Sequence, residues 1–392
     1  LQAMGLVGTE DYQRALTVLD GAQGDRKGIA YRAWVRVKAH LGLGEIHAAL
    51  KWCRELDRAA RGFVDGQLLY CDVLMQLRRF KEAADRLRKL LKTHPHHAKA
   101  YREIVSAYLG MGKHQDALKY YYTAQKNGVS HSDLAGLNEL LMKASRGPAW
   151  RSRRCVQTEH YDIFTNMSQD LGEAAAQVLE ESYARYAAEV APARRQTGPR
   201  FRVFLFGSRA GYNVYCYGLS MRSAHNTLGV YFPALRQLLI FNAPGMMDTI
   251  RHEGFHQYLD SVISAAPHWV HEGMAVYYQA GSVGEDGVAP MSEGDLLLLE
   301  EHDNERITLE QLIFEDTRDF SRRGRLSYSY AWSFVHFLMH TTPDNRKLLR
   351  SVLSNLKKSV PVQEAIEKAF KKVDLTQLNT DYWNYVEDLM GR

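Results

Sequence analysis

The stretch "TIRHEGFHQYL", residues 249–259, contains two histidines and a glutamate in the order His252-Glu253-x-x-His256. On a helix, residues four apart are rotated by only about 40° from one another, so both imidazoles can reach one point beside the helix. Glu253 lies between them, where its carboxylate could touch a water held at that point. The pattern favours a metal site with hydrolytic chemistry, although two hydrogen-bonded histidines on a partly buried helix would give the same letters.

A third ligand is available further along the chain, where "PHWVHEGMAVYY" (267–278) supplies Glu272. Zinc in a hydrolytic site takes three protein ligands and keeps a fourth position open for water. Pro267 and Trp269 indicate the start of a helix that continues past Glu272. A carboxylate in the first turn of a helix can also simply stabilise the helix dipole, so this alternative stays open for Glu272.

Together the two segments resemble the gluzincins of the peptidase MA superfamily, in which a W-x-x-E-G-x-A segment follows the H-E-x-x-H helix. Trp269, Glu272, Gly273 and Ala275 match that segment one for one. The resemblance extends over about residues 156–392 and implies a zincin-like metallopeptidase domain with a small sheet and a helical lobe.

The resemblance implies one Zn²⁺ per chain, held by His252, His256 and Glu272, and no other cofactor. Zinc would lower the pKa of its water from about 16 toward about 7, which gives a hydroxide nucleophile at neutral pH. Glu253 would take the proton of that water and pass it to the leaving amine. The implied activity is zinc-dependent hydrolysis of peptide bonds in a protein or peptide substrate.

A donor to the developing oxyanion is expected in "LSYSYAWSFVHFL" (326–338). Tyr330 matches the position of the catalytic tyrosine in the resembling family, and Tyr328 is its close competitor. Packing alone would explain Tyr330 almost as well. The extended segment "RQLLIFN" (236–242) is expected to form the sheet edge along which a substrate lies.

Two departures from the family bear on specificity. His271 stands where the aminopeptidase branch often has Asn, and the G-x-M-E-N motif that recognises a free amino terminus is absent. We therefore expect an endopeptidase rather than an aminopeptidase. His271 is expected to point roughly 100° away from Glu272 and so to stay out of the metal site.

The first third of the chain repeats with a period of 34 residues, because alanines fall at Ala15, Ala49, Ala83 and Ala117 with larger side chains at fixed offsets around each. Period and pattern resemble the tetratricopeptide repeat. The resemblance implies an all-α solenoid whose concave surface binds a protein partner or regulator. We expect this domain to span residues 1–146, with a capping helix over 131–145.

A basic linker is expected at residues 147–155, and a different pattern follows it. Strands are expected over 156–166, 201–206, 228–232 and 236–242, and helices over 171–190 and 246–263. Helices dominate from there on, apart from an expected loop over 281–295. The second domain, residues 156–392, should therefore have an α+β fold.

Composition excludes several classes of protein. The net charge of +5 is modest for 392 residues, so nucleic acid is not expected as a partner. The basic clusters at 151–154 and 194–202 are expected to be solvated loops; a nucleic-acid site there would show binding that weakens steeply with salt. No apolar run is long enough to span a membrane, and either a cytoplasmic or an exported protein is compatible with the sequence.

Some reactive residue types are expected to be structural. Cys53 and Cys71 fall on buried repeat positions, and the cysteines show no pairing pattern for a disulfide or a zinc site. His336 and His340 are four apart, but no carboxylate follows them at a suitable distance. A structural or substrate-contact role is expected for both.

Two functions remain on this evidence. The first is a gluzincin-type zinc metallopeptidase whose repeats recruit a substrate or regulator. The second is a non-catalytic interaction protein, in which the repeats bind a partner and the metallopeptidase-like domain is a scaffold that is inactive or only binds zinc. The cleavage specificity and the partner of the repeats are not encoded in any recognisable motif.

Overall fold

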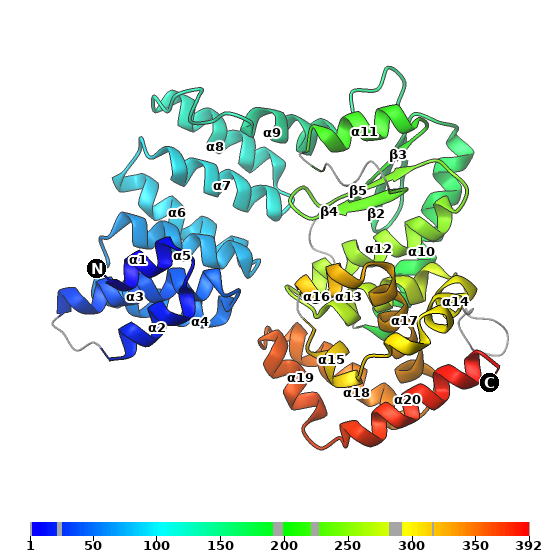
Figure 1. Ribbon diagram of the computed structural model, residues 1–392. Helices are drawn as coiled ribbons and strands as arrows, with labels where there is room; N and C mark the ends of the chain where they lie inside the picture. The colour runs from blue at the N-terminus through cyan, green and yellow to red at the C-terminus, as the bar shows by residue number, and fades with distance from the viewer. Residues whose placement is uncertain are drawn as a thin grey trace. The chain divides into compact units, whose positions relative to one another are not determined.

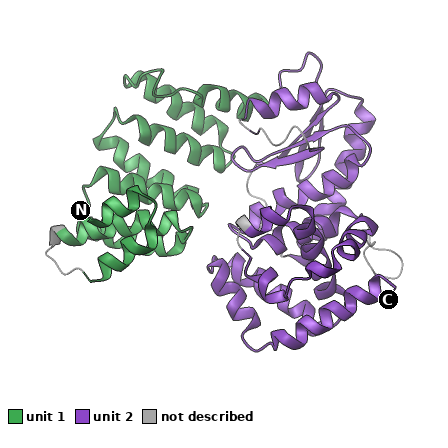
Figure 2. Cartoon of the chain, viewed as in Figure 1, with its two compact units in different colours: residues 1–147 green, residues 148–392 purple. Residues whose placement is uncertain are grey.

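The structure is a computed structural model that describes residues 2–21, 26–190, 199–219, 221, 227–281, 292–315 and 317–391. The chain divides into two compact units, residues 1–147 and residues 148–392 (Figure 2). The division falls beside the predicted end of the first domain at residue 146. The predicted linker 147–155 already includes the start of strand β1 (Arg154–Gln157), so only its first part connects the units.

The first unit is all-helical in its described part, and consecutive helices pack as antiparallel pairs (Figure 1). Every second helix also contacts its counterpart in the next pair, as α5 does with α7, which is typical of a stack of helical repeats. The helices are α1 (Gln2–Gly8), α2 (Tyr12–Asp20), α3 (Arg26–Gly42), α4 (Ile46–Ala59), α5 (Val64–Gln76), α6 (Phe80–Thr93), α7 (Ala98–Gly110), α8 (His114–Lys126) and α9 (Leu137–Arg146).

The alanines of the 34-residue repeat lie in the core of the helical unit. Ala15, Ala49, Ala83 and Ala117 are all fully buried. Cys53 is also buried, one turn after Ala49, as expected for a small core residue. Because an alanine side chain is small, the facing helix backbone can come close while larger neighbours fill the remaining space.

The same period recurs in the backbone. Glu10, Gly44, Arg78 and Gly112 each have a positive φ, between 56° and 76°, and each stands in the turn that joins two helices. A left-handed residue at this point reverses the chain within a few residues. The 34-residue repeat is therefore present both in the geometry of the turns and in the positions of the buried residues.

The second unit contains a five-stranded mixed sheet with the order β1-β2-β3-β5-β4. Strands β2 (Tyr161–Thr165), β3 (Phe201–Phe206) and β5 (Gln237–Phe241) are parallel, while β1 and β4 (Gly229–Phe232) pair antiparallel at the two edges. The single strand predicted over 156–166 is instead a hairpin, because residues 158–160 turn the chain between β1 and β2. Strands β3, β4 and β5 lie within one residue of their predicted bounds.

Alternation along β3 places one hydrophobic layer on each face of the sheet. Val203 and Leu205 belong to the large core that includes α10 (Gln169–Glu189) and α12 (Met246–Val262). Phe204 and Phe206 face the other way and meet the rings of Trp150 and of Tyr215 on α11 (Arg209–Tyr217). The helices α10 and α12 thus cover one face of the sheet and α11 the other (Figure 1).

A helical lobe follows α12 and is centred on α17 (Arg325–His340), which is buried on nearly all sides. α13 (His268–Gln279) packs against both α12 and α17 and so joins the lobe to the sheet. The remaining elements are α14 (Glu293–Glu301), the short 3-10 helix η2 (Asp303–Glu305), α15 (Leu309–Ile313), α16 (Thr317–Arg323), α18 (Pro343–Lys357), α19 (Val362–Phe370) and α20 (Leu375–Leu389).

The last sequence-based predictions concern two loop segments of the second unit and the absence of a membrane-spanning helix. Most of the predicted loop 281–295 and residues 194–198 of the second basic cluster lie outside the described residues. Within the described part, no helix is both long enough and apolar enough to cross a membrane.

Candidate metal centre

Helix α12 is fixed against the sheet and against α10. It begins after Gly245, whose φ of 79° turns the chain out of β5. Gln257 donates through its side-chain amide to the carbonyls of Arg202 and Arg236, 3.3 and 3.1 Å away. From α10, the Tyr186 hydroxyl donates to the carbonyl of Arg251 at 2.6 Å. These bonds tie the helix to its neighbours at Arg251 and at Gln257, directly before His252 and directly after His256.

Helix α13 lies unusually close to α17. A Cβ atom at Gly273 would stand 2.3 Å from the carbonyl oxygen of Ala331, so only glycine permits this approach. Trp269, one turn earlier, is buried and packs on Phe334 of α17. Glycine and tryptophan therefore fix the position of Glu272, which stands next to Gly273 on the same helix.

His252, His256 and Glu272 come together between α12 and α13. One ligand atom from each lies within 4.8 Å of the other two. The Oε2 atom of Glu272 is 3.6 Å from Nε2 of His252 and 3.4 Å from Nε2 of His256. The three sequence-predicted ligands thus converge on one point, and the described residues contain no other such group.

His252, His256 and Glu272 are called the triad below. Their atoms that face away from this point make contacts with neighbouring side chains. His252 donates through Nδ1 to the side-chain oxygen of Gln279, 2.9 Å away, which leaves Nε2 free to bind a ligand. The second carboxylate oxygen of Glu272 accepts from Nδ1 of His271 at 3.2 Å. The His271 ring also stacks on His256, with centroids 4.3 Å apart. Such outer contacts fix the orientation of metal-binding side chains.

His271 is therefore closer to the triad than its helical angle predicts. Its ring contacts both Glu272 and His256, yet it does not join the three-residue cluster. Gln279 was not singled out from the sequence at all. Its position seven residues after Glu272, two turns along α13, was the available signal.

Burial and mutual contact shift the pKa values of the triad. Burial lowers the pKa of His256, which favours the neutral imidazole. Burial also acts to lower the pKa of His252, but its contact with Glu272 and the charges of Glu253 and Glu272 raise it overall. Burial opposes ionisation of Glu272, yet the neighbouring histidines hold its pKa well below the usual value. A neutral imidazole and an ionised carboxylate are the forms that bind metal, so the shifts of His256 and Glu272 favour binding, whereas the raised pKa of His252 opposes it.

Glu253 lies on the side of α12 that faces strand β4. Its Oε2 atom accepts a hydrogen bond from the backbone N–H of Tyr231, 2.8 Å away. The Tyr231 hydroxyl donates in turn to Asp260 at 2.5 Å, one to two turns further along α12. The Glu253 carboxylate is therefore held in place next to His252. Its negative charge helps to raise the pKa of His252.

The two candidate tyrosines on α17 face different surroundings. The Tyr330 hydroxyl donates to the carbonyl of Glu305 at 3.0 Å, and its ring packs on Trp383, away from the triad. Tyr328 lies about 200° around the helix from it. Burial and the charges of Glu272 and Glu253 raise the pKa of Tyr328 to about 12. The structure thus brings Tyr328, and not the predicted Tyr330, toward the carboxylates of the site.

Strand β4 forms the sheet edge nearest the triad. The segment expected to be that edge, 236–242, is instead the internal strand β5, which pairs with β3 on one side and β4 on the other. An internal strand has no free backbone groups for a substrate, whereas an edge strand does. The expectation for 236–242 is corrected to Gly229–Phe232.

The remaining histidines of this region make structural contacts. His268 stacks on Phe320 with centroids 5.0 Å apart. His336 is fully buried, and its Nδ1 lies 2.7 Å from the Tyr385 hydroxyl. His340 lies 2.9 Å from the Tyr277 hydroxyl. None of the three belongs to the metal-type cluster of the described residues.

Two family models match parts of the chain. A family described as "Protein of unknown function (DUF1570)" matches residues 246–363, from the start of α12 into α19. This segment contains His252, His256, Glu272 and both candidate tyrosines. A family described as "Bacterial transcriptional activator domain" (BTAD) matches residues 35–129, within the helical repeats. No curated protein matches the chain significantly.

Proposed function

We propose that this protein is a zinc-dependent metallopeptidase of the gluzincin type, with a tetratricopeptide-like repeat unit that recruits a substrate or regulator. The observation that carries the proposal is the convergence of His252, His256 and Glu272, whose ligand atoms lie within 4.8 Å of one another. Two imidazoles and one carboxylate form a donor set that catalytic zinc takes, with one position left for water.

The surroundings of the triad fit such an ion. Nε2 of His252 and of His256 both face the same oxygen of Glu272, and each lies less than 4 Å from it. The bond from His252 to Gln279 fixes the tautomer with the lone pair on Nε2. When bound, zinc supplies a Lewis acid that activates water at neutral pH and polarises the carbonyl of a peptide.

Glu253 is proposed as the general base. Its carboxylate would accept the proton of the attacking water and then deliver it to the nitrogen of the leaving amine. The backbone N–H of Tyr231 occupies one carboxylate oxygen, so the other oxygen is available for this transfer. Tyr328 is proposed as the donor to the developing oxyanion, because it lies close enough to Glu272 and Glu253 for their charges to raise its pKa.

Strand β4 is proposed to align the substrate. Its outer edge is unpaired by any other described strand, and its Tyr231 N–H already contacts the proposed base. A peptide that adds to this edge would be held extended beside Glu253. The absence of a sequence motif for a free amino terminus favours internal cleavage of a chain, as an endopeptidase does.

The helical repeat unit suggests protein interaction, in agreement with the BTAD match to residues 35–129. We propose that it binds a protein substrate or a regulator of the second unit. The competing function is an interaction protein with a non-catalytic metallopeptidase-like scaffold. Metal content and turnover separate these two functions.

The first test is the zinc content of protein purified without added metal. We expect about one zinc per chain in the wild type, as for a three-ligand site. We expect it to be lost in Glu272→Ala and kept in Glu301→Ala, an exposed glutamate of α14 that serves as the matched control. Wild-type protein that holds no zinc even after metal is added back would overturn the proposal and favour the scaffold.

The second test separates zinc binding from turnover. Glu253→Gln should retain zinc but lose peptidase activity by about 100-fold or more, because a general base contributes on that order. The assay is cleavage of an unfolded protein substrate followed by mass spectrometry of the products. Full activity of Glu253→Gln would show that this mechanism is wrong, whatever the zinc content.

A further inference from the structure

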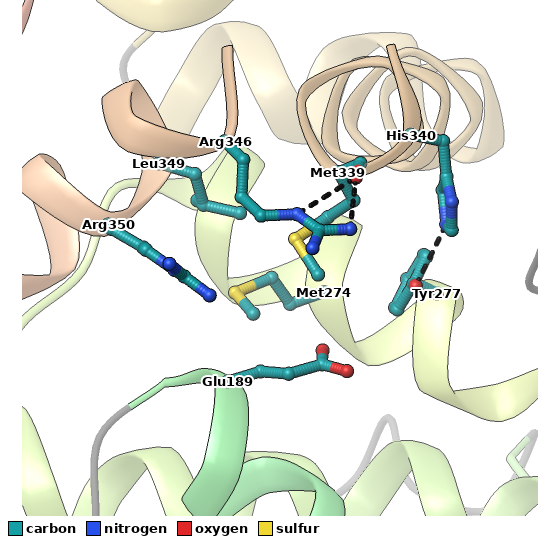
Figure 3. A pocket seen from close by; sticks show the side chains of 8 residues that line it. All are labelled: Glu189, Met274, Tyr277, Met339, His340, Arg346, Leu349 and Arg350. Atoms are coloured by element: carbon teal, nitrogen blue, oxygen red, sulfur yellow. Dashed lines mark hydrogen bonds between the residues drawn. The ribbon is translucent and has the colours of Figure 1, made fainter. Parts of the chain in front are cut away.

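A cavity lies within the second unit, outside the candidate metal centre. It has a volume of about 100 Å³ and is bordered by α10, α13, α17 and α18. By the space that one water molecule needs, it holds on the order of eight water-sized groups. Charged side chains lie on two opposite sides of it, and the rest of the lining combines apolar side chains with the hydrogen-bonded pair Tyr277 and His340 (Figure 3).

One side of the cavity carries two positive charges. Arg346 and Arg350 extend from α18 to this side (Figure 3). Nε and Nη2 of Arg346 donate to the carbonyl of Met339, 3.1 and 2.6 Å away, which fixes the guanidinium plane and leaves its Nη1 donors free of that bond. Among the described residues no carboxylate lies within ion-pair distance of Arg350.

The opposite side carries one negative charge. Glu189 at the end of α10 faces the two arginines across the cavity (Figure 3). It accepts a hydrogen bond from the Tyr278 hydroxyl at 2.6 Å, which holds the carboxylate in place and leaves further acceptor positions. No ion pair joins Glu189 to Arg346 or Arg350 in the described part of the chain, so the opposite charges face a common space instead of neutralising each other.

Apolar side chains line part of the space between the charges. The thioethers of Met274 and Met339 and the side chain of Leu349 line it (Figure 3). Met274 and Met339 are buried. Methionine side chains adapt to ligands of different shape and contact them through a polarisable sulfur.

We propose that this cavity binds a free α-amino acid with a small aliphatic side chain. The arginines hold its carboxylate, Glu189 holds its ammonium group, and the methionines contact its side chain. Valine has eight non-hydrogen atoms, in agreement with the volume. A zwitterion satisfies both charged walls at once, whereas an anion or a cation alone would leave one wall unmatched. The site is independent of the proposed peptidase function.

The test is isothermal titration calorimetry of the full chain with L-valine, N-acetyl-L-valine and L-valinamide. We expect valine to bind and each blocked analogue to bind at least about tenfold more weakly, since each loses one charge-assisted contact. Equal binding of valine and either analogue overturns the zwitterion site. So does the absence of valine binding at tens of millimolar.

A matched pair of variants places the binding in this cavity. Arg350→Gln removes one positive charge from the cavity wall. Lys347→Gln is the control: it removes one positive charge from the same helix, but Lys347 is exposed, pairs with Asp344 and does not line the cavity. Valine should bind to Arg350→Gln at least about tenfold more weakly than to Lys347→Gln. Equal affinity in the two variants would locate any binding elsewhere and overturn the proposal. Both residues are exposed, so neither change removes core packing.

Discussion

Tyr328 and Tyr330 lie two residues apart on α17, yet their hydroxyls have different partners. Tyr328→Phe should lower kcat/KM of the proposed peptidase by about 100-fold, the usual cost of a lost oxyanion donor, with little change in stability. Tyr330→Phe should leave kcat/KM unchanged and lower the free energy of unfolding by about 1 kcal/mol, because the hydrogen bond to Glu305 is lost. The measurements are steady-state kinetics and urea unfolding of both variants. The reverse pattern would return the catalytic role to Tyr330.

The pattern of α17 explains why the sequence alone does not distinguish Tyr328 from Tyr330. Thirteen of its 16 residues are buried, so apolar residues occur on every side of the helix. Such a helix has no single apolar face, and neither composition nor spacing indicates which side faces the candidate metal centre. The triad was predictable because its residues belong to two short motifs whose internal geometry is set by the helix itself.

Glu103 on α7 should give the repeat unit a pH-dependent stability. Burial, and secondarily the charge of Asp72 on α5, raise the pKa of Glu103 from 4.5 to about 8. The Nζ atom of Lys99, 3.3 Å from Oε1 of Glu103, acts to lower this pKa but does not outweigh them. Between these two pKa values the unfolded chain has released a proton that the folded chain still holds. The unfolding free energy should therefore fall as pH rises through this window and level off above about 8.

Glu103→Gln should remove this slope, because glutamine carries no proton to release. Urea unfolding across the window, followed for the repeat unit, measures the slope in the variant and in the wild type. Glu301→Gln, an exposed change in the other unit, should keep the slope of the wild type. An unchanged slope in Glu103→Gln would assign the pH dependence to another group.

At the scale of elements, the contact between α13 and α17 determines where Glu272 stands. Gly273→Ala would place a methyl group 2.3 Å from the carbonyl oxygen of Ala331, and a helix backbone cannot move aside locally. We expect a loss of about 1–3 kcal/mol in unfolding free energy, together with weaker zinc binding, as the helices separate. Gly294→Ala on α14, where the added methyl group meets nothing within 4 Å, is the control and should not destabilise the protein. Thermal unfolding and zinc titration of the pair test this.

At the scale of elements, the order of the strands within the sheet could not be predicted from the sequence. The strands themselves were predictable from their alternating and apolar runs, and β3 to β5 lie close to their expected bounds. Which strand forms the edge depends on where each crossover returns the chain. Strand β5 enters between β3 and β4, although β4 precedes it in the sequence. Local patterns do not encode that placement, so the substrate edge was assigned to the wrong strand.

At the scale of the whole molecule, the candidate metal ligands belong to the second unit, residues 148–392, and the repeats to the first. The 34-residue period predicted the first unit because each repeat contacts mainly its neighbours, so local sequence determines much of its structure. The second unit depends on contacts between distant segments, such as the bond from α10 to the carbonyl of Arg251. The motifs of the second unit could be recognised in the sequence, but the packing of its elements against one another could not be predicted.

Zinc should stabilise one unit and not the other, because all three proposed ligands belong to residues 148–392. A ligand that binds only the folded state adds about 2.7 kcal/mol when its free concentration is 100 times its Kd. Hydrogen exchange with mass spectrometry, with and without zinc, should therefore show slower exchange in α12 and α13 and no change in α3 to α8. Glu272→Ala should abolish the difference. Equal protection of both units would mean that zinc acts elsewhere or couples the repeats to the site, and no protection of α12 would remove the metal centre from this helix pair.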